Sequence, residues 1–381
     1  MTTRTRDAIL GAIGVVALAC YILACGPAFS PDDSKVLFPS NDPRTGHVVM
    51  AMYDRGTRTT RPLLVLPAEA GESPPAYAWT QDGSRAVALW VEDDAVLRIA
   101  VVPLKTGQAL RLLTIPDFKS SQMENVYWHP CVVGASLFIG GEDTIRRIDL
   151  ETGAEVTAKV DGATRLLALG DRVYYERHLP DEGTTTGRAE FGLLDLQALT
   201  LAPRFVAAGV GADVLAVSRD GTRIAVAAEE DDAKQIRIFE DGRARATLAL
   251  GAGNDAREIA GMPQWSRDGT SLYYTYYERL DDQHRQYGIL ELPIDGSAPR
   301  LLPLLVAGAS DSLMPLDVSH DGRTLATVST YLQTSTEQLA QGKQPTLQPA
   351  DLALYLVDLA TARRTVTRIP IPPLPEQTDA R

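Results

Sequence analysis

The amino-acid sequence predicts an all-β protein, a seven-bladed β-propeller of four-stranded antiparallel blades preceded by an N-terminal hydrophobic segment. Two observations carry this prediction. A short string with an Asp-Gly pair between apolar runs recurs at nearly regular intervals, and the best-preserved interval contains four strand-like segments. Four strands within a period of roughly 40–50 residues are characteristic of a propeller blade.

The recurring string predicts a tight hairpin turn, because glycine enters the required backbone conformation without steric cost. The turn aspartates of the clear copies are Asp82, Asp220, Asp268 and Asp321, and a weaker copy contains Asp32. Apart from one long interval, their spacings are 50, 48 and 53 residues. The 138 residues between Asp82 and Asp220 accommodate three periods. We therefore expect two degenerate copies there, at Tyr127–Pro130 and Leu167–Arg172.

The best-preserved unit gives the expected order of strands within a blade. Its segments are Ala76–Trp79, Arg85–Trp90, Val96–Val102 and Leu110–Leu113. Helical periodicity is nearly absent after the first 25 residues. The predicted organisation is a signal peptide or membrane anchor in residues 1–25, a propeller in residues 26–370 and a proline-rich tail in residues 371–381.

The strings Phe29–Asp32, Trp79–Ser84 and Trp265–Thr270 resemble the TolB-like propeller repeat, a relative of the WD40 repeat found mainly in bacterial envelope proteins. The resemblance covers about nine-tenths of the chain. It implies the fold and an envelope location, but no particular activity. The α/β domain that precedes the propeller in the namesake of the family is not expected here, because the first repeat follows directly on the hydrophobic segment.

Residues 1–25 have the layout of a bacterial export signal, with two arginines before an uncharged apolar run. The run ends in Ile22-Leu23-Ala24-Cys25, which resembles a lipobox, so we expect lipidation at Cys25. Cys20 ends a poorer second candidate, and an uncleaved membrane span or ordinary cleavage are the alternatives. In each case the basic N-terminus predicts a propeller outside the inner membrane. Because glycine and not aspartate follows Cys25, attachment to the outer membrane is slightly favoured.

The net charge bears on the class of partner, and the cysteine content bears on disulfide bonding. The net charge of −12 argues against a nucleic-acid partner, which would require clustered lysines and arginines. Three cysteines occur, and Cys131 would be alone once the leader is processed. We therefore expect no intramolecular disulfide and a buried thiol at Cys131.

The loops between second and third strands emerge on one face of a propeller, and here they are acidic. The residues of this predicted interaction face are Glu92, Asp93, Asp94, Glu142, Asp143, Glu229, Glu230, Asp231, Asp232, Asp281 and Asp282. Such a face could meet a cationic partner or collect divalent cations. Solvated loops also favour acidic residues, and none of these loops has the regular spacing of a calcium loop. We therefore predict no specific metal site.

The sequence carries no motif that would identify an enzyme. Its five histidines are far apart, and no metal-ligand spacing, nucleophile elbow or phosphate-binding glycine loop before a helix occurs. We predict no catalytic residue and no cofactor. Our first hypothesis is a non-enzymatic, membrane-anchored scaffold that docks another envelope protein or complex. The alternative is an extracytoplasmic protein that binds a glycan, peptide or cation at the channel mouth, and a third hypothesis is an enzyme in the central channel.

Overall fold

The structure is a computed structural model. It describes residues 26–41, 48–67, 75–92, 96–105, 109–116, 118, 130–162, 164–179, 188–208, 210–230, 233–249, 257–280, 284–308, 312–313, 316–330, 353–360 and 365–370. The predicted leader with Cys25 and the predicted tail, residues 371–381, lie outside the described residues. No helix among the described residues is long and apolar enough to cross a membrane.

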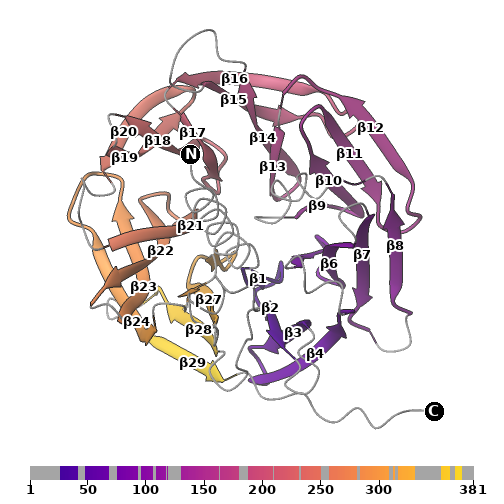
Figure 1. Ribbon diagram of the computed structural model, residues 1–381, viewed down its shortest axis with the longest axis horizontal. Helices are drawn as coiled ribbons and strands as arrows, with labels where there is room; N and C mark the ends of the chain where they lie inside the picture. The colour runs from indigo at the N-terminus through magenta and orange to yellow at the C-terminus, as the bar shows by residue number, and fades with distance from the viewer. Residues whose placement is uncertain are drawn as a thin grey trace, which may run out of the picture.

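The described strands form seven antiparallel sheets, arranged as blades around a central channel, and they confirm the predicted fold class (Figure 1). Each of the first six blades contains four consecutive strands, and each strand pairs with the next. In the seventh blade the inner strand is divided into two short segments that both pair with the second strand. The first strand of every blade lies nearest the channel, and the last lies at the perimeter (Figure 1).

The strand bounds of the first four blades are as follows. Blade 1 contains β1 (Ala28–Phe29), β2 (Lys35–Asn41), β3 (Val48–Asp54) and β4 (Thr59–Val65). Blade 2 contains β5 (Ala76–Trp79), β6 (Arg85–Glu92), β7 (Val96–Pro103) and β8 (Arg111–Ile115). Blade 3 contains β9 (Cys131–Val133), β10 (Ser136–Gly140), β11 (Thr144–Asp149) and β12 (Glu155–Lys159). Blade 4 contains β13 (Thr164–Leu169), β14 (Arg172–Leu179), β15 (Arg188–Leu194) and β16 (Leu201–Ala208).

Three further blades complete the ring. Blade 5 contains β17 (Val210–Val217), β18 (Arg223–Glu230), β19 (Ala233–Glu240) and β20 (Arg243–Ala249). Blade 6 contains β21 (Arg257–Trp265), β22 (Ser271–Arg279), β23 (His284–Pro293) and β24 (Arg300–Gly308). Blade 7 contains β25 (Ser312–Leu313), β26 (Asp317–Val318), β27 (Thr324–Thr330), β28 (Ala353–Asp358) and β29 (Val366–Pro370).

The repeated turn between the first and second strands is held by its own polar side chains, as blade 2 shows. The Thr80 hydroxyl donates to Asp82 at 2.6 Å and accepts the Arg85 N–H at 3.1 Å. Asp82 also accepts the Ser84 N–H at 3.0 Å, and Gly83 has φ +65°, a conformation that glycine adopts without a Cβ clash. The same hydroxyl–carboxylate bond joins Ser30 to Asp32, Ser218 to Asp220, Ser266 to Asp268 and Ser319 to Asp321.

The two degenerate repeats behave differently. The copy predicted at Leu167–Arg172 is confirmed as the turn between β13 and β14, where Gly170 has φ +62°. In blade 3 the turn falls later than the predicted string Tyr127–Pro130, at Gly134 with φ +59°. The aromatic and proline residues therefore precede the strand β9, and glycine still supplies the turn conformation.

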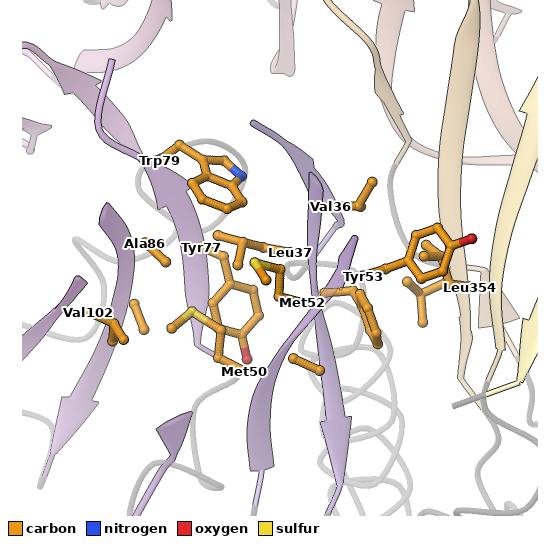
Figure 2. Close-up of a cluster of buried hydrophobic side chains, with 14 of the residues drawn as sticks. Val36, Leu37, Met50, Met52, Tyr53, Tyr77, Trp79, Ala86, Val102 and Leu354 are labelled. Atoms are coloured by element: carbon orange, nitrogen blue, oxygen red, sulfur yellow. The ribbon is translucent and has the colours of Figure 1, made fainter. Parts of the chain in front are cut away.

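Neighbouring blades pack through apolar side chains that alternate along each strand. On β6, Trp90 belongs to the cluster shared with blade 1, whereas Leu89 belongs to the cluster shared with blade 3. Figure 2 shows the first of these clusters, which also contains Tyr53 of blade 1 and Leu354 of blade 7. One continuous core thus extends across the place where the first and last blades meet.

In four blades the outer strand contains an irregularity that discourages pairing with a strand of another molecule. In β4, β16, β20 and β24 the register against the third strand shifts at an equivalent place, which produces a β-bulge. Three of these bulges adjoin Pro62, Pro203 and Pro303. Proline lacks an N–H group and a bulge bends the edge, and both discourage edge-to-edge association.

Candidate functional site at the channel mouth

A cavity of about 400 Å³ lies in the central channel, at the end bounded by the turns between first and second strands. Every blade contributes to its wall, through Phe29, Trp79, Val132, Leu167, Val217, Trp265 and Val318. The cavity exists because the seven inner strands leave space at the axis that their side chains do not fill. A pocket with an apolar wall and a few polar groups is the usual form of a binding site.

The rim of the cavity is formed by one position of the repeated turn, the residue that follows the serine or threonine whose hydroxyl donates to the turn aspartate. This position is occupied by Pro31, Gln81, Arg219, Arg267 and His320, and all five line the cavity. The aspartate that follows in the same turns does not line it, because its carboxylate is bonded to its own turn. The rim therefore presents neutral and basic side chains, although the chain as a whole has a net charge of −12.

The two rim arginines differ in their availability. Arg267 donates from Nη1 to the carbonyl oxygen of Asp321 at 2.7 Å, which ties blade 6 to blade 7. Arg219 is exposed and makes no hydrogen bond or ion pair with another described residue. Its guanidinium is free to bind a carboxylate or a similar anion in the bidentate geometry that arginine favours.

One carboxyl group, that of Asp317, also lines the cavity. Asp317 of β26 accepts the Phe29 N–H at Oδ2, 2.7 Å away, and the Val318 N–H at Oδ1, 2.9 Å away. Removal from water raises the pKa of Asp317 to about 6, and the negative charge of Asp33 adds to this, whereas the Phe29 N–H and His320 oppose it. Asp317 is still partly accessible from the cavity, so it can exchange a proton there.

The tryptophans in the wall serve the scaffold. Trp79 is 7% exposed and Trp265 is 6% exposed. Their indole N–H groups donate to the carbonyl oxygens of Ala28 and Ala216, respectively, on the inner strand of the preceding blade. An indole so bonded and covered has little surface left for contact with a ligand. Polar groups at the rim, and not aromatic stacking, therefore define the chemistry of this site.

The predicted acidic face lies at the opposite end of the strands from this cavity. Glu142 and Asp143 are exposed between β10 and β11, while Glu92 is in an ion pair with Arg98 on the neighbouring strand. Glu229 and Glu230 are the last residues of β18. The remaining members, Asp93, Asp94, Asp231, Asp232, Asp281 and Asp282, lie outside the described residues. The functional use of these loops stays a prediction.

Sequence reasoning missed the rim because its members share a position and not a residue type. Proline, glutamine, arginine and histidine at one place become visible as a set only when the turn copies are aligned and the channel-facing position is known. Across the described ranges, no group of three His, Cys, Asp or Glu residues could hold a metal ion.

Comparisons with known proteins show the fold. No protein-family model matches this chain, and no curated protein matches it. A solved protein from Lactobacillus plantarum has a TM-score of 0.51 and 15% identity, over 88% of this chain and 95% of that chain. Oligogalacturonate lyase from Vibrio parahaemolyticus has a TM-score of 0.49 and 15% identity, over 87% of this chain and 84% of that chain. TolB from Acinetobacter baumannii has a TM-score of 0.45 and 17% identity, and the match covers 72% of this chain and 65% of that chain.

The similarity to the Lactobacillus plantarum protein is one of fold, and a shared fold does not imply a shared activity.

Proposed function

We propose that this protein is a non-enzymatic propeller of the bacterial cell envelope that docks a segment of another envelope protein at the mouth of its central channel. The observation that carries the proposal is the seven-blade cavity with its basic and neutral rim. Because the rim position is free of acidic side chains, an acidic or carboxylate-bearing segment would meet Arg219 first. The apolar inner strands below would then accept its uncharged side chains.

The charge distribution supports this choice of partner. In a protein with a net charge of −12, the exposed arginines at this mouth offer cationic groups to which an anionic partner can bind. Arg219 is not engaged by another described side chain, so binding a partner there would break no internal ion pair. A docked segment would contact several blades at once, and its specificity would come from the sum of many small contacts.

A ligand-binding role is the second candidate, and cavity size favours it. About 400 Å³ falls within the range of roughly 300–1,000 Å³ that small-molecule sites occupy. A ligand of this kind would stabilise the isolated protein against unfolding, whereas a protein partner would co-purify with it.

The decisive experiment is affinity purification of the tagged full-length protein from gently solubilised membranes, followed by mass spectrometry. We expect a stoichiometric companion that is lost in Arg219→Glu and retained in Arg61→Glu. Arg61 is an exposed arginine on the outer strand β4, so its variant carries the same charge reversal far from the cavity. Loss of the companion in both variants would indicate a general charge effect and would overturn the assignment to the mouth.

A parallel variant tests the opposite face. Glu142 and Asp143 are exposed and belong to the predicted acidic face, so Glu142→Lys with Asp143→Lys reverses its charge at a described site. Loss of the companion in this variant, with retention in Arg219→Glu, would assign docking to the acidic loops. An isolated protein without any companion would reject the scaffold and leave ligand binding, to be screened by melting shifts.

The anchor is part of the same proposal. Lipidation at Cys25 would hold the propeller at a membrane, with the outer membrane slightly favoured. Metabolic labelling with a radioactive or clickable palmitate should mark the wild type and Cys20→Ser, and should fail in Cys25→Ser. Labelling that survives Cys25→Ser would place the lipid elsewhere, and absence of labelling in the wild type would favour an uncleaved helix or a released protein.

A further inference from the structure

Among the described strands, none is shared between the first and last blades. All described strands of blade 1 come from the start of the propeller and all those of blade 7 from its end, and no sheet of described strands contains members of both. Backbone pairing between described strands therefore does not join the first blade to the last. The seam between them depends on the common apolar core and on a small set of polar contacts.

The main polar contact is made by Asp33, which occupies the position where other turns of the repeat have glycine. In four other turns the position after the aspartate is glycine with φ between +65° and +71°, at Gly83, Gly221, Gly269 and Gly322. Blade 1 has Asp33 at this position with φ +58°, a conformation that is less favourable for a residue with a Cβ than for glycine. Unlike glycine, Asp33 has a carboxylate that can accept hydrogen bonds from another blade.

Asp33 reaches across the seam to the turn of blade 7. Its Oδ1 accepts the His320 N–H at 2.6 Å and lies 3.0 Å from His320 Nδ1. Its Oδ2 accepts the Asp321 N–H at 2.7 Å. Three contacts to one carboxylate make Asp33 the clasp that holds the two end blades together at the channel mouth.

Two further contacts support the clasp. The Phe29 N–H of β1 donates to Asp317 of β26, 2.7 Å away. Arg55 donates from Nη1 to the carbonyl oxygen of Asp33 at 2.8 Å and from Nη2 to the Thr324 hydroxyl at 2.7 Å. The charged and titratable groups around the seam are Asp32, Asp33, Lys35 and Arg55 of blade 1, Arg267 of blade 6, and Asp317, His320, Asp321 and Arg323 of blade 7.

We propose that this seam is the gate at which the propeller ring opens, and that the gate closes more tightly in mildly acidic solution. Asp33 and Asp317 bring two negative charges to the same junction, where each of them interacts with His320. A proton on Asp317 removes one of these charges. Because Phe29, Asp317 and His320 line the cavity, opening the seam would widen the channel mouth.

The direction of the pH effect follows from linkage. The pKa of Asp317 in the closed ring, about 6, lies above its ordinary value of 3.8. Its protonated form therefore favours closure, fully so below about pH 4, and this contribution is lost as the pH rises through 6. The Ser30 hydroxyl and other donors lower the pKa of Asp32 to about 2, so that turn loses its support only in much stronger acid. Between pH 7.5 and 5.5 the seam should tighten.

Hydrogen exchange of the full-length protein, followed by mass spectrometry at pH 7.5 and 5.5 and corrected for intrinsic rates, tests the gate without any ligand. We expect β2 and β27 to exchange more slowly at the lower pH by at least about threefold, while β11 and β15 in blades 3 and 4 stay unchanged. A change of equal size in all blades, or no change at the seam, would overturn the proposal.

Variants distinguish the loss of the Asp33 contacts at the seam from a general loss of stability. Asp33→Gly keeps the turn conformation but removes the carboxylate, and should accelerate exchange at the seam about tenfold at both pH values, as expected for lost charge-assisted hydrogen bonds. Asp33→Asn retains one acceptor oxygen and should give a smaller increase. Asp241→Gly is the matched control, because Asp241 also has positive φ, +49°, but lies in blade 5. Asp317→Asn should abolish the pH dependence, and persistence of the dependence in this variant would reject the role of Asp317.

Discussion

The indole N–H of Trp265 donates a hydrogen bond to the carbonyl oxygen of Ala216, 3.1 Å away on the inner strand of the neighbouring blade. Trp79 makes the equivalent bond to Ala28 at 2.9 Å. Inner strands have a free edge toward the channel, so their carbonyl groups need partners from outside their own sheet. The tryptophan of the repeat thus joins adjacent blades by a polar contact as well as by packing.

Trp265→Phe should destabilise the protein by about 1–3 kcal/mol, because it leaves the buried carbonyl of Ala216 without its donor. The free energy of unfolding from urea denaturation measures the effect. Trp90→Phe is the matched control, since the Trp90 Nε1 is buried without a hydrogen-bond partner in the described structure. Equal costs for the two variants would show that packing alone accounts for the tryptophan.

Gly288→Ala should destabilise blade 6 by about 3 kcal/mol or more. An added Cβ would lie 2.3 Å from the carbonyl oxygen of Leu302 and 2.8 Å from the ring of Tyr276, so the backbone of β24 would have to shift. Gly56→Ala, whose Cβ would meet only the Asp54 carboxylate at 3.3 Å, should change the stability by less than about 1 kcal/mol. Thermal unfolding of the two variants in parallel checks the contrast, and a tolerated Gly288→Ala would contradict the packing described for this bulge.

Asp82→Asn should lower the melting temperature at neutral pH, with a difference from the wild type that shrinks in acid. Hydrogen bonds from the Thr80 hydroxyl and from Ser84 hold the pKa of Asp82 at about 2, below its ordinary value of 3.8. Its ionised form therefore stabilises the fold above about pH 4, and this support is lost as the pH falls through 2. Because the side chain is exposed, we expect no more than about 1 kcal/mol. A difference that stays constant from pH 7 to pH 3 would argue against an ionic contribution.

The Cys131 thiol should resist alkylation in the folded protein. Burial in an apolar environment raises its pKa well above that of an ordinary thiol, so almost no thiolate forms near neutral pH. Iodoacetamide labelling, read from the Cys131 peptide by mass spectrometry, should be slow in buffer and fast in denaturant. Rapid labelling under native conditions would mean that β9 is less well packed than its 2% exposure indicates.

The fold could be predicted because its signals are local. A hydroxyl, an aspartate and a glycine within five residues specify a turn, and apolar alternation on either side specifies the two strands. In blade 3 the turn lacks the hydroxyl and the aspartate of the other copies, but the spacing of neighbouring copies still locates the blade. The turn lies later than the predicted string there, because Gly134 alone sets its position.

The candidate site could not be predicted in the same way. Asp33 and His320 are 287 residues apart, so no periodicity relates them. In the sequence, Asp33 is only a departure from the glycine of the repeat, whereas in the structure it joins the first blade to the last. Arg219 likewise carries no local signal, because its significance lies in the channel that seven separate turns surround.

Every blade is built from one uninterrupted stretch of chain, and this has a consequence for how such a protein can change over generations. Duplication or loss of a single genetic unit would add or remove a whole sheet without cutting any hydrogen-bonded ladder. The number of blades could then vary by one step at a time, provided that the outermost units keep complementary ends. In such a history, Asp33 and the blade 7 turn that it contacts would have to be kept. The turns of the interior blades would be under no such requirement.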